Sequence, residues 1–206
     1  MAMIIESFPV GMLQCNCVIL GSEQTREAIV IDPGDEIEKV VSRLEKHGLT
    51  AKYIVATHAH IDHVGGFKAI KEQTGAPLYL HKGDLFLYEA LPMQAQMLGL
   101  TAPPITEIDA WLDHGDQLGT GEVKLDIIHT PGHTPGSLCF HTASEAHLYA
   151  GDTLFMGSIG RTDLWGGSFE QIMESLQRRV INLPDETIVI PGHGPKTTIG
   201  RAKIYN

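Results

Sequence analysis

The chain has 206 residues, of which 43% are hydrophobic, and its formal net charge is −10. This length and apolar content are sufficient for one substantial core, so we expect a single domain over residues 1–206. An acidic chain without a run of Lys or Arg repels a phosphate backbone, and aromatic residues that could stack on bases are only 6% of the sequence. The composition therefore argues against a nucleic-acid substrate or partner.

The sequence also lacks the patterns of membrane and secreted proteins. No apolar stretch approaches the roughly 20 residues of a bilayer span, and the first residues lack a basic segment followed by a long apolar one. The chain has three cysteines, an odd number without the spacing of a disulfide framework. We therefore expect a cytoplasmic protein in a reducing compartment, with Cys15 and Cys17 as small buried residues on one face of a strand.

Hydrophobic periodicity predicts strands at the start of the chain and alternating helices and strands after them, which is typical of the α/β class. In the first half we expect strands at 4–10, 16–21, 28–32, 53–56 and 76–81, with helices at 36–47 and 67–73. In the second half we expect strands at 122–128, 138–142, 147–150 and 187–190, with a helix at 168–180 capped by Ser168. The apolar segment 84–100, interrupted by Pro92, is either a core helix pair or a mobile wall of a substrate cleft.

The densest group of metal-ligand side chains follows the predicted strand 53–56. Three imidazoles and a carboxylate occupy six positions: His58, His60, Asp62 and His63. These groups would repel one another when protonated and compete for partners when neutral unless a cation held them, so we predict a metal site. If the loop is extended, His58, His60 and Asp62 project to one side and His63 to the adjacent side, so that one segment serves two neighbouring ions.

Three further ligand-type residues each follow a predicted strand in the second half of the chain. They are His133 within the turn TPGHTPG, Asp152 within AGDT and His193 within IPGHGP. A strand end followed by small residues places one polar side chain at the rim of a sheet, where α/β proteins usually have their sites. With the two oxygens of Asp152 as a bridge, the whole set completes two ions: His58, His60 and His133 hold one, and Asp62, His63 and His193 hold the other.

Two residues outside this set are candidates for supporting or substrate-binding roles. Asp32, at the end of a buried apolar strand, either accepts a hydrogen bond from a metal-bound imidazole or caps the turn that follows it. Arg161 either pairs with Asp163 or binds a substrate carboxylate, and we favour the internal pair.

The motifs that carry these residues occur together in one known family. The combination of HxHxDHxGG at 58–66, PGHTPG at 131–136, GD at 151–152 and PGHG at 191–194 resembles the metallo-β-lactamase superfamily, and within it the hydroxyacylglutathione hydrolase (glyoxalase II) branch. The segment GSIGRTD at 157–163 resembles the single-domain glyoxalase II-like hydrolases in particular. The resemblance covers nearly the whole chain and implies a four-layer αββα sandwich with a dinuclear zinc or iron site that uses the ligands named above.

The predicted site and this resemblance together imply a metal-dependent thioester hydrolase. Two cations that share a water lower its pKa to near neutrality, so that hydroxide is available without a His general base. That hydroxide would attack the carbonyl of a small thioester such as S-lactoylglutathione, with Asp62 both as a ligand and as the group that orients the nucleophile. The GxSxG pattern of a serine nucleophile is absent from the sequence.

Three other functions remain open at this point. A persulfide dioxygenase also resembles the chain and would use one ferrous ion held by His58, His133 and Asp152, although PGHGP replaces the PAHDY-like pattern of that family. A lactonase or β-lactamase would share the metals, and a non-catalytic metal-binding protein would not need the full ligand set. Full-length glyoxalase II has a C-terminal helical domain that holds glutathione, whereas this sequence ends at Asn206, so we expect weak glutathione binding.

Overall fold

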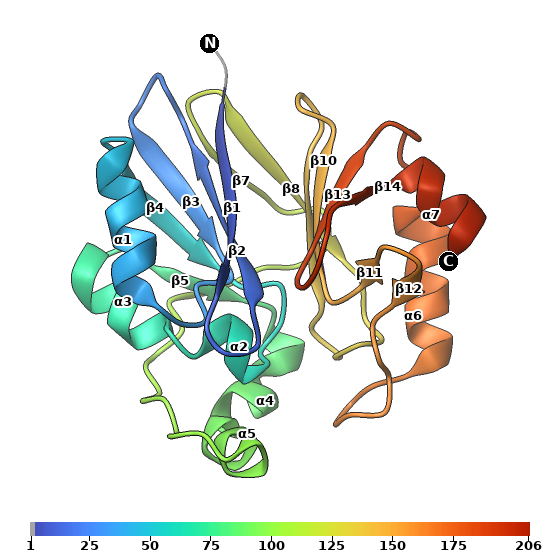
Figure 1. The fold of residues 1–206 in the computed structure, drawn as a ribbon, viewed down its shortest axis with the longest axis horizontal. Helices are drawn as coiled ribbons and strands as arrows, with labels where there is room; N and C mark the ends of the chain where they lie inside the picture. The colour runs from blue at the N-terminus through green and yellow to red at the C-terminus, as the bar shows by residue number, and fades with distance from the viewer. Residues whose placement is uncertain (1–2) are drawn as a thin grey trace.

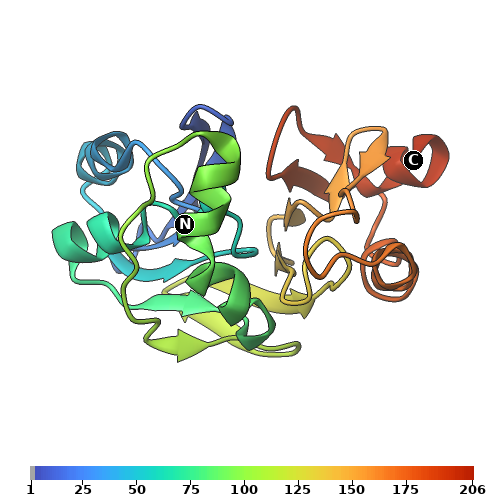
Figure 2. The same ribbon diagram turned by 90° about the horizontal axis from the view of Figure 1, so that it is seen from below.

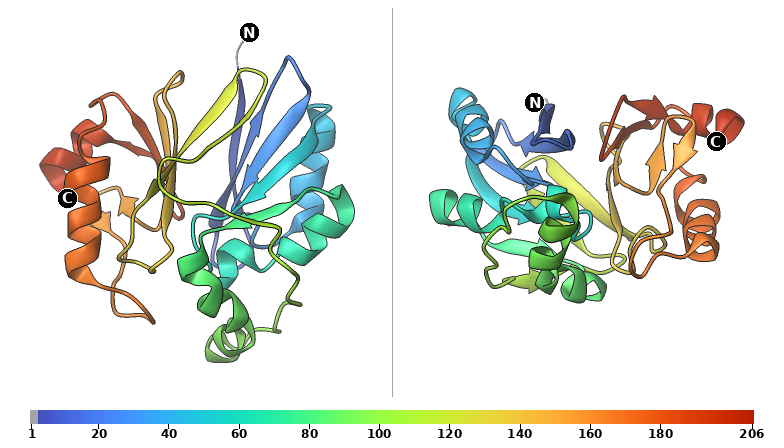
Figure 3. Two further views of the ribbon diagram at one scale, coloured as in Figure 1. Left: turned by 180° about the vertical axis from the view of Figure 1, so that it is seen from behind. Right: turned by 60° about the horizontal axis from the view of Figure 1, so that its bottom comes forward.

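Two six-stranded sheets face each other, and helices cover the outer face of each (Figure 1). The computed structural model describes residues 3–206; Met1 and Ala2, which fall within the expected domain 1–206, lie outside the described residues. Seen from behind, the helices of the N-terminal half lie on one outer side and those of the C-terminal half on the other (Figure 3). The four-layer αββα sandwich implied by the resemblance is therefore confirmed.

The first sheet comes from the N-terminal half, and its strand order follows the sequence. Its strands are β1 (Ile4–Val10), β2 (Cys15–Gly21), β3 (Glu27–Ile31), β4 (Thr50–Val55), β5 (Leu78–Leu80) and β6 (Ala110–Trp111). The first three strands are antiparallel, and β3 to β6 run parallel. Two helices cover its outer face: α1 (Ile37–Lys46) and α3 (Phe67–Thr74). The apolar stripe predicted for α1 is the face that it buries, through Ile37, Val40 and Leu44.

The second sheet comes from the C-terminal half and has the order β14-β13-β10-β9-β8-β7. Its strands are β7 (Gln117–Thr120), β8 (Val123–His129), β9 (Leu138–Thr142), β10 (His147–Gly151), β13 (Ile188–Pro191) and β14 (Thr197–Thr198). Two helices lie on its outer face: α6 (Phe169–Ser175), which continues into a π-helical turn at Leu176–Val180, and α7 (Ile199–Tyr205). A small separate hairpin consists of β11 (Leu154–Phe155) and β12 (Ser158–Ile159).

The space between the sheets is filled by apolar side chains from both of them. Ile31 and Val55 of the first sheet and Phe140 and Tyr149 of the second belong to this buried cluster. Central strands that are covered on both faces are apolar at consecutive rather than alternate positions, as in the buried segment AIVI of β3. This closely filled middle layer fixes the relative position of the two sheets and of the loops that leave them.

The segment 84–100 forms two short helices, α4 (Leu85–Glu89) and α5 (Leu91–Leu98), after a 3-10 turn at Lys82–Asp84. Leu87 and Ala95 are buried against the first sheet, whereas Met93 and Met97 are exposed. The core helix pair considered for this segment is therefore present. Within residues 3–206, no helix is both long enough and apolar enough to cross a bilayer.

The loops that carry the predicted site lie at one edge of the sandwich. The parallel pairs β3/β4 and β10/β13 each end at this edge. The polar residues directly after these strands therefore come together there. Figure 2 looks onto this edge from below, with α4 and α5 in green on the side of the first sheet and the loops of the second half opposite them. The carboxyl ends of parallel strands are the usual place for a site in α/β proteins.

Candidate metal centre

The loop after β4 carries four of the seven predicted ligands and becomes helical halfway along. His60 has extended backbone, and the single turn α2 (Ile61–Val64) begins directly afterwards. The backbone N–H groups of His63 and Val64 both donate to the carbonyl of His60, at 3.0 and 3.2 Å. The loop is therefore not extended as far as Asp62, which was the condition considered from the sequence. Because Asp62 and His63 belong to a helical turn, Asp62 groups with His63 rather than with His58 and His60.

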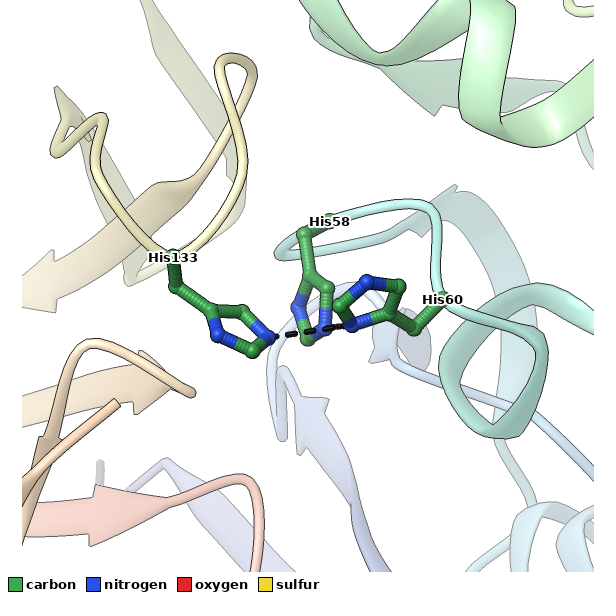
Figure 4. A group of neighbouring side chains, drawn as sticks. All are labelled: His58, His60 and His133. Atoms are coloured by element: carbon green, nitrogen blue, oxygen red, sulfur yellow. Dashed lines mark hydrogen bonds between the residues drawn. The ribbon is translucent and has the colours of Figure 1, made fainter. Parts of the chain in front are cut away.

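His58, His60 and His133 form a first group of converging imidazoles (Figure 4). Nδ1 of His60 lies 3.0 Å from Nε2 of His58 and 3.0 Å from Nε2 of His133. Burial and the neighbouring imidazoles lower the pKa of His58, and they lower the pKa of His60 to about 3. Burial also lowers the pKa of His133. All three rings are neutral at physiological pH, and neutral imidazoles aimed at one point suit Zn²⁺ or iron.

Asp62, His63 and His193 form a second group beside the first. Oδ2 of Asp62 lies 3.0 Å from Nε2 of His193 and 3.6 Å from Nε2 of His63. Burial opposes the ionisation of Asp62, but the neighbouring imidazoles of His63 and His193 outweigh burial and hold the pKa of its carboxyl well below its usual range. A carboxylate with two imidazoles is a common ligand set for divalent transition metals.

Asp152 lies between the two groups and presents one oxygen to each. Its Oδ2 is 3.6 Å from Nε2 of His133, and its Oδ1 is 3.7 Å from Nε2 of His63 and 3.9 Å from Nε2 of His193. Gly192 permits this approach, because a Cβ at that position would lie 2.2 Å from Oδ1 of Asp152. The structure thus brings all seven predicted ligand residues together, with the carboxylate of Asp152 where a bridge would lie.

Several polar atoms of this cluster lack a partner within residues 3–206. Nε2 of His63 and Oδ1 of Asp152 are buried and make no hydrogen bond, although buried polar atoms in native proteins almost always make one. Nδ1 of His193 lies 3.0 Å from the carbonyl oxygen of Leu13, which can only accept, so Nε2 of the neutral ring has no proton. This bare nitrogen faces the carboxylate of Asp62. A divalent cation between the groups would give each of these atoms a partner, and the residues present fit a divalent-metal centre.

The outer nitrogens of two further imidazoles are also held by acceptors. Nδ1 of His63 lies 2.9 Å from Oδ2 of Asp32, and Nδ1 of His133 lies 2.8 Å from the carbonyl oxygen of Arg161. Such contacts fix the proton on the outer nitrogen and leave the lone pair of the inner nitrogen free for a metal.

Asp32 accepts three hydrogen bonds and joins the end of β3 to the metal loop. Its Oδ1 accepts from the backbone N–H of Thr57, and its Oδ2 accepts from the hydroxyl of Thr57, both at 2.7 Å. The third bond comes from His63. The backbone of Asp32 has φ 51°, in the left-handed region that Asp tolerates better than most residues. Of the two roles considered for Asp32, contact with an imidazole of the metal loop is the one that the structure contains.

The side chain of Arg161 is paired with its near neighbour. Its Nε and Nη2 donate to the two carboxylate oxygens of Asp163, both at 2.7 Å, and both side chains are exposed. The internal pair favoured from the sequence is therefore present. The contact of this residue with His133 is made by its backbone carbonyl, so the identity of the side chain is not what positions that imidazole.

Asp84, which the sequence motifs do not single out, is a buried carboxylate that joins the two metal loops. It accepts from the N–H of Ala59 at 2.9 Å, in the loop after β4. It also accepts from the hydroxyl of Thr134 at 2.8 Å and the N–H of Gly136 at 2.6 Å, on either side of the turn that follows His133. An available signal was its place shortly after the predicted strand 76–81, the same relation to a strand that the predicted ligands have.

Gln94, on α5, is a second residue that sequence reasoning missed. Its Oε1 accepts from the N–H of Ile61 at 2.9 Å, and its Nε2 donates to the carbonyl of Ala59 at 3.1 Å. It therefore supports the point at which the metal loop becomes helical. A Gln on a short helix remote from the motif gives no sequence signal for this role.

A family profile described as the Metallo-beta-lactamase superfamily matches residues 10–193. The chain belongs to the metallo-beta-lactamase superfamily. A relative within it, Hydroxyacylglutathione hydrolase GloC from Haemophilus influenzae, is 38% identical over 99% of this chain and 97% of its own length.

Solved structures of this superfamily resemble the chain along nearly its whole length. BLEG-1, described as a B3 metallo-beta-lactamase, has a TM-score of 0.89 and 36% identity, covering 96% of this chain and 95% of its own. TTHA1623 in a di-iron-bound form has a TM-score of 0.89 and 38% identity, covering 98% of each chain. This protein is thus a metallo-hydrolase of the metallo-beta-lactamase superfamily, with its His and Asp cluster placed to bind divalent metal.

Proposed function

We propose that this protein is a thioester hydrolase that acts on a small acylated thiol such as S-lactoylglutathione. The observation that carries the proposal is the pair of donor groups joined by Asp152, which fits two divalent ions side by side. Similarity to Hydroxyacylglutathione hydrolase GloC over nearly the full length of both chains favours a thioester among the possible substrates. The net charge of −10 favours a small molecule over nucleic acid.

In this proposal the two ions are zinc, iron or one of each. Five imidazoles and two carboxylates supply the donors, a set that suits these metals better than Mg²⁺ or Ca²⁺, which prefer oxygen ligands. Asp152 would serve both ions. The other ligands divide into two groups: His58, His60 and His133 would hold one ion, and Asp62, His63 and His193 would hold the other.

When bound, two divalent ions polarise the substrate carbonyl and lower the pKa of water. Asp62 then orients the reactants: its carboxylate is ionised, and its side chain keeps 17% of its surface exposed at the cluster, where it accepts a hydrogen bond from the attacking water. The oxygen of that water bonds to the carbonyl carbon, and the carbon–sulfur bond breaks with its electron pair going to sulfur. A proton from the water ends on the sulfur, so the products are a carboxylic acid and a thiol.

Covalent catalysis by a cysteine is disfavoured by the surroundings of Cys15. Its Sγ lies 3.5 Å from Nδ1 of His63, which resembles a cysteine–histidine pair. However, the residue is fully buried, and burial outweighs the opposing effect of the neighbouring His63 and raises the pKa of its thiol to about 12. A nucleophilic cysteine needs a lowered pKa and access to substrate. Hydrolysis by water is therefore the mechanism that we propose.

The test is a substrate comparison on protein purified without chelator, with its metal content measured by elemental analysis. We expect close to two ions per chain and faster turnover of S-lactoylglutathione or a minimal thioester than of a β-lactam or a lactone. Faster turnover of a β-lactam would replace the proposal with the function that similarity to BLEG-1 makes the second candidate. Binding of only one iron per chain, together with oxygen consumption when glutathione persulfide is added, would replace the proposed hydrolase with a dioxygenase.

A further inference from the structure

A groove of about 280 Å³ opens beside Asp62, between the β1–β2 turn and the segment after α5. Its apolar lining comes from three separate parts of the chain: Val10, Met12, Leu13, Ile61, Leu100 and Pro103. Met12 is 69% exposed and Leu13 is 41% exposed, so large apolar side chains are left open to solvent at its rim. Whole small molecules usually occupy roughly 300–1,000 Å³, so a groove of this size suits one substituent of a substrate.

The groove is continuous with the metal centre. Asp62, a proposed ligand, forms part of its wall. Leu13 forms another part, and its carbonyl oxygen is the acceptor that lies 3.0 Å from Nδ1 of His193. A carbonyl group placed at the metal centre therefore has one of its two substituents beside the groove.

The charges on the groove decide which half of a thioester it fits. Besides the proposed ligand Asp62, whose charge a bound ion would offset, the charged residue that lines the groove is Asp35, which is acidic. Common thiol carriers such as glutathione and coenzyme A are anionic through their carboxylates or phosphates, and this wall would repel them. A hydrocarbon acyl chain has no charge to repel and gains free energy by covering the exposed apolar lining.

We propose that this groove binds the acyl chain of the substrate, so that the protein prefers linear hydrocarbon acyl groups of medium length to acetyl or lactoyl. The inference rests on the proposed thioester hydrolysis and narrows its substrate class. Each methylene group buried in an apolar site adds about threefold to fourfold in binding. The value of kcat/KM is therefore expected to rise by about that factor per methylene and to level off once the groove is filled.

The test is a series of N-acetylcysteamine thioesters with acetyl, butyryl, hexanoyl and octanoyl groups, which share one uncharged thiol. We expect kcat/KM for hexanoyl to exceed that for acetyl at least about thirtyfold. The variant Met12→Asp adds a charge at the rim and is expected to reduce this ratio about tenfold. Ile204→Asp, the same kind of change at an exposed apolar residue of α7, is the matched control and should retain the ratio. A flat series, or equal loss in both variants, would overturn the proposal.

A binding measurement separates this inference from the proposed function. Alkyl methyl ketones, in which a CH₃ group replaces the thiol half of the thioester, are not hydrolysed. They can be titrated into protein labelled with ¹³C at the methionine methyl groups. We expect a long-chain ketone, but not a short one, to shift the Met12 resonance and to leave that of Met156, outside the groove, unchanged. A shift of the Met12 resonance without cleavage of any thioester would contradict the proposed hydrolysis but support acyl-chain binding in the groove. Thioester cleavage without this shift would support the hydrolysis and contradict acyl-chain binding in the groove.

Discussion

Asp32 holds His63 by its outer nitrogen: Oδ2 of Asp32 lies 2.9 Å from Nδ1 of His63, and both side chains are buried. Because a carboxylate can only accept, the proton of the neutral ring is on Nδ1, and the lone pair on Nε2 faces Asp62 and Asp152. A residue at the end of β3 thereby determines which atom of the metal loop is available to an ion.

Replacing Asp32 by Asn should therefore weaken the binding of one ion more than that of the other. The amide would present an NH₂ group near Nδ1 of His63 and favour the tautomer with the proton on Nε2. We expect the affinity for the ion beside His63 to fall about 10- to 100-fold, while the other ion is retained. Titration of the metal-free protein with zinc against a chelator measures both affinities. Asp116→Asn changes an exposed residue and is the control, which should bind both ions with normal affinity. Normal affinity for the ion beside His63 in Asp32→Asn would show that the contact does not select the tautomer.

The hydrogen bonds of Asp84 lead to a prediction about the stability of the metal-free protein. Its carboxylate accepts three hydrogen bonds, and an Asn in its place has one acceptor oxygen, so at least one buried donor loses its partner. We expect Asp84→Asn to lower the free energy of unfolding of the metal-free protein by about 1–3 kcal/mol, measured by urea denaturation. Thr134→Val removes one of the donors together with the need to satisfy it and should cost less. A larger cost for Thr134→Val would contradict the clamp between the two loops.

Much of the fold could be predicted from local sequence pattern. Each expected strand and helix has a counterpart in the structure, and Ser168 caps α6 by accepting from the N–H of Gln171 at 3.3 Å. The elements that were missed include the helix α7, the strand β7 and the two-residue strands β6 and β14. A two-residue strand is defined by its pairing partner rather than by periodicity, so its own sequence contains no signal for it.

In the candidate site, too, features with a local sequence signal could be predicted, and features that depend on distant residues could not. Ligand-type residues could be found because His and Asp are rarely concentrated in glycine-rich turns without a reason, and those turns follow recognisable strands. The helical turn at Ile61–Val64 could not be predicted, because the hydrogen bonds that support it come from Gln94 on a distant helix. Asp84 was missed for a related reason, since its partners at Ala59 and Gly136 become neighbours only when the two halves of the sandwich come together.

Away from the metal centre, Glu6 should make stability depend on pH. Burial opposes its ionisation, but hydrogen bonds from His47, Arg43 and Lys46 outweigh burial and lower the pKa of Glu6 to about 2. Since the folded pKa lies below the unfolded value, the ionised carboxylate stabilises the fold above about pH 4.5, and this contribution is lost as the pH falls towards 2. In the metal-free protein, Glu6→Gln should cost about 1–2 kcal/mol at pH 7 and progressively less between pH 4.5 and 2. A cost that is constant with pH in urea denaturation would contradict this account.

Asp62 should be the residue whose charge matters most for turnover. Asn at this position keeps the shape of the side chain but removes the negative charge that faces His63 and His193. We expect Asp62→Asn to lower kcat for the preferred thioester at least about a hundredfold, because both a metal ligand and the group that orients water are weakened. Elemental analysis should still find the ion of His58, His60 and His133, which does not depend on Asp62. Asp126→Asn, on β8 and paired with Gln117, is the matched control and should turn over normally. If Asp62→Asn keeps near-normal kcat, the carboxylate has a structural role, and another group must position the attacking water.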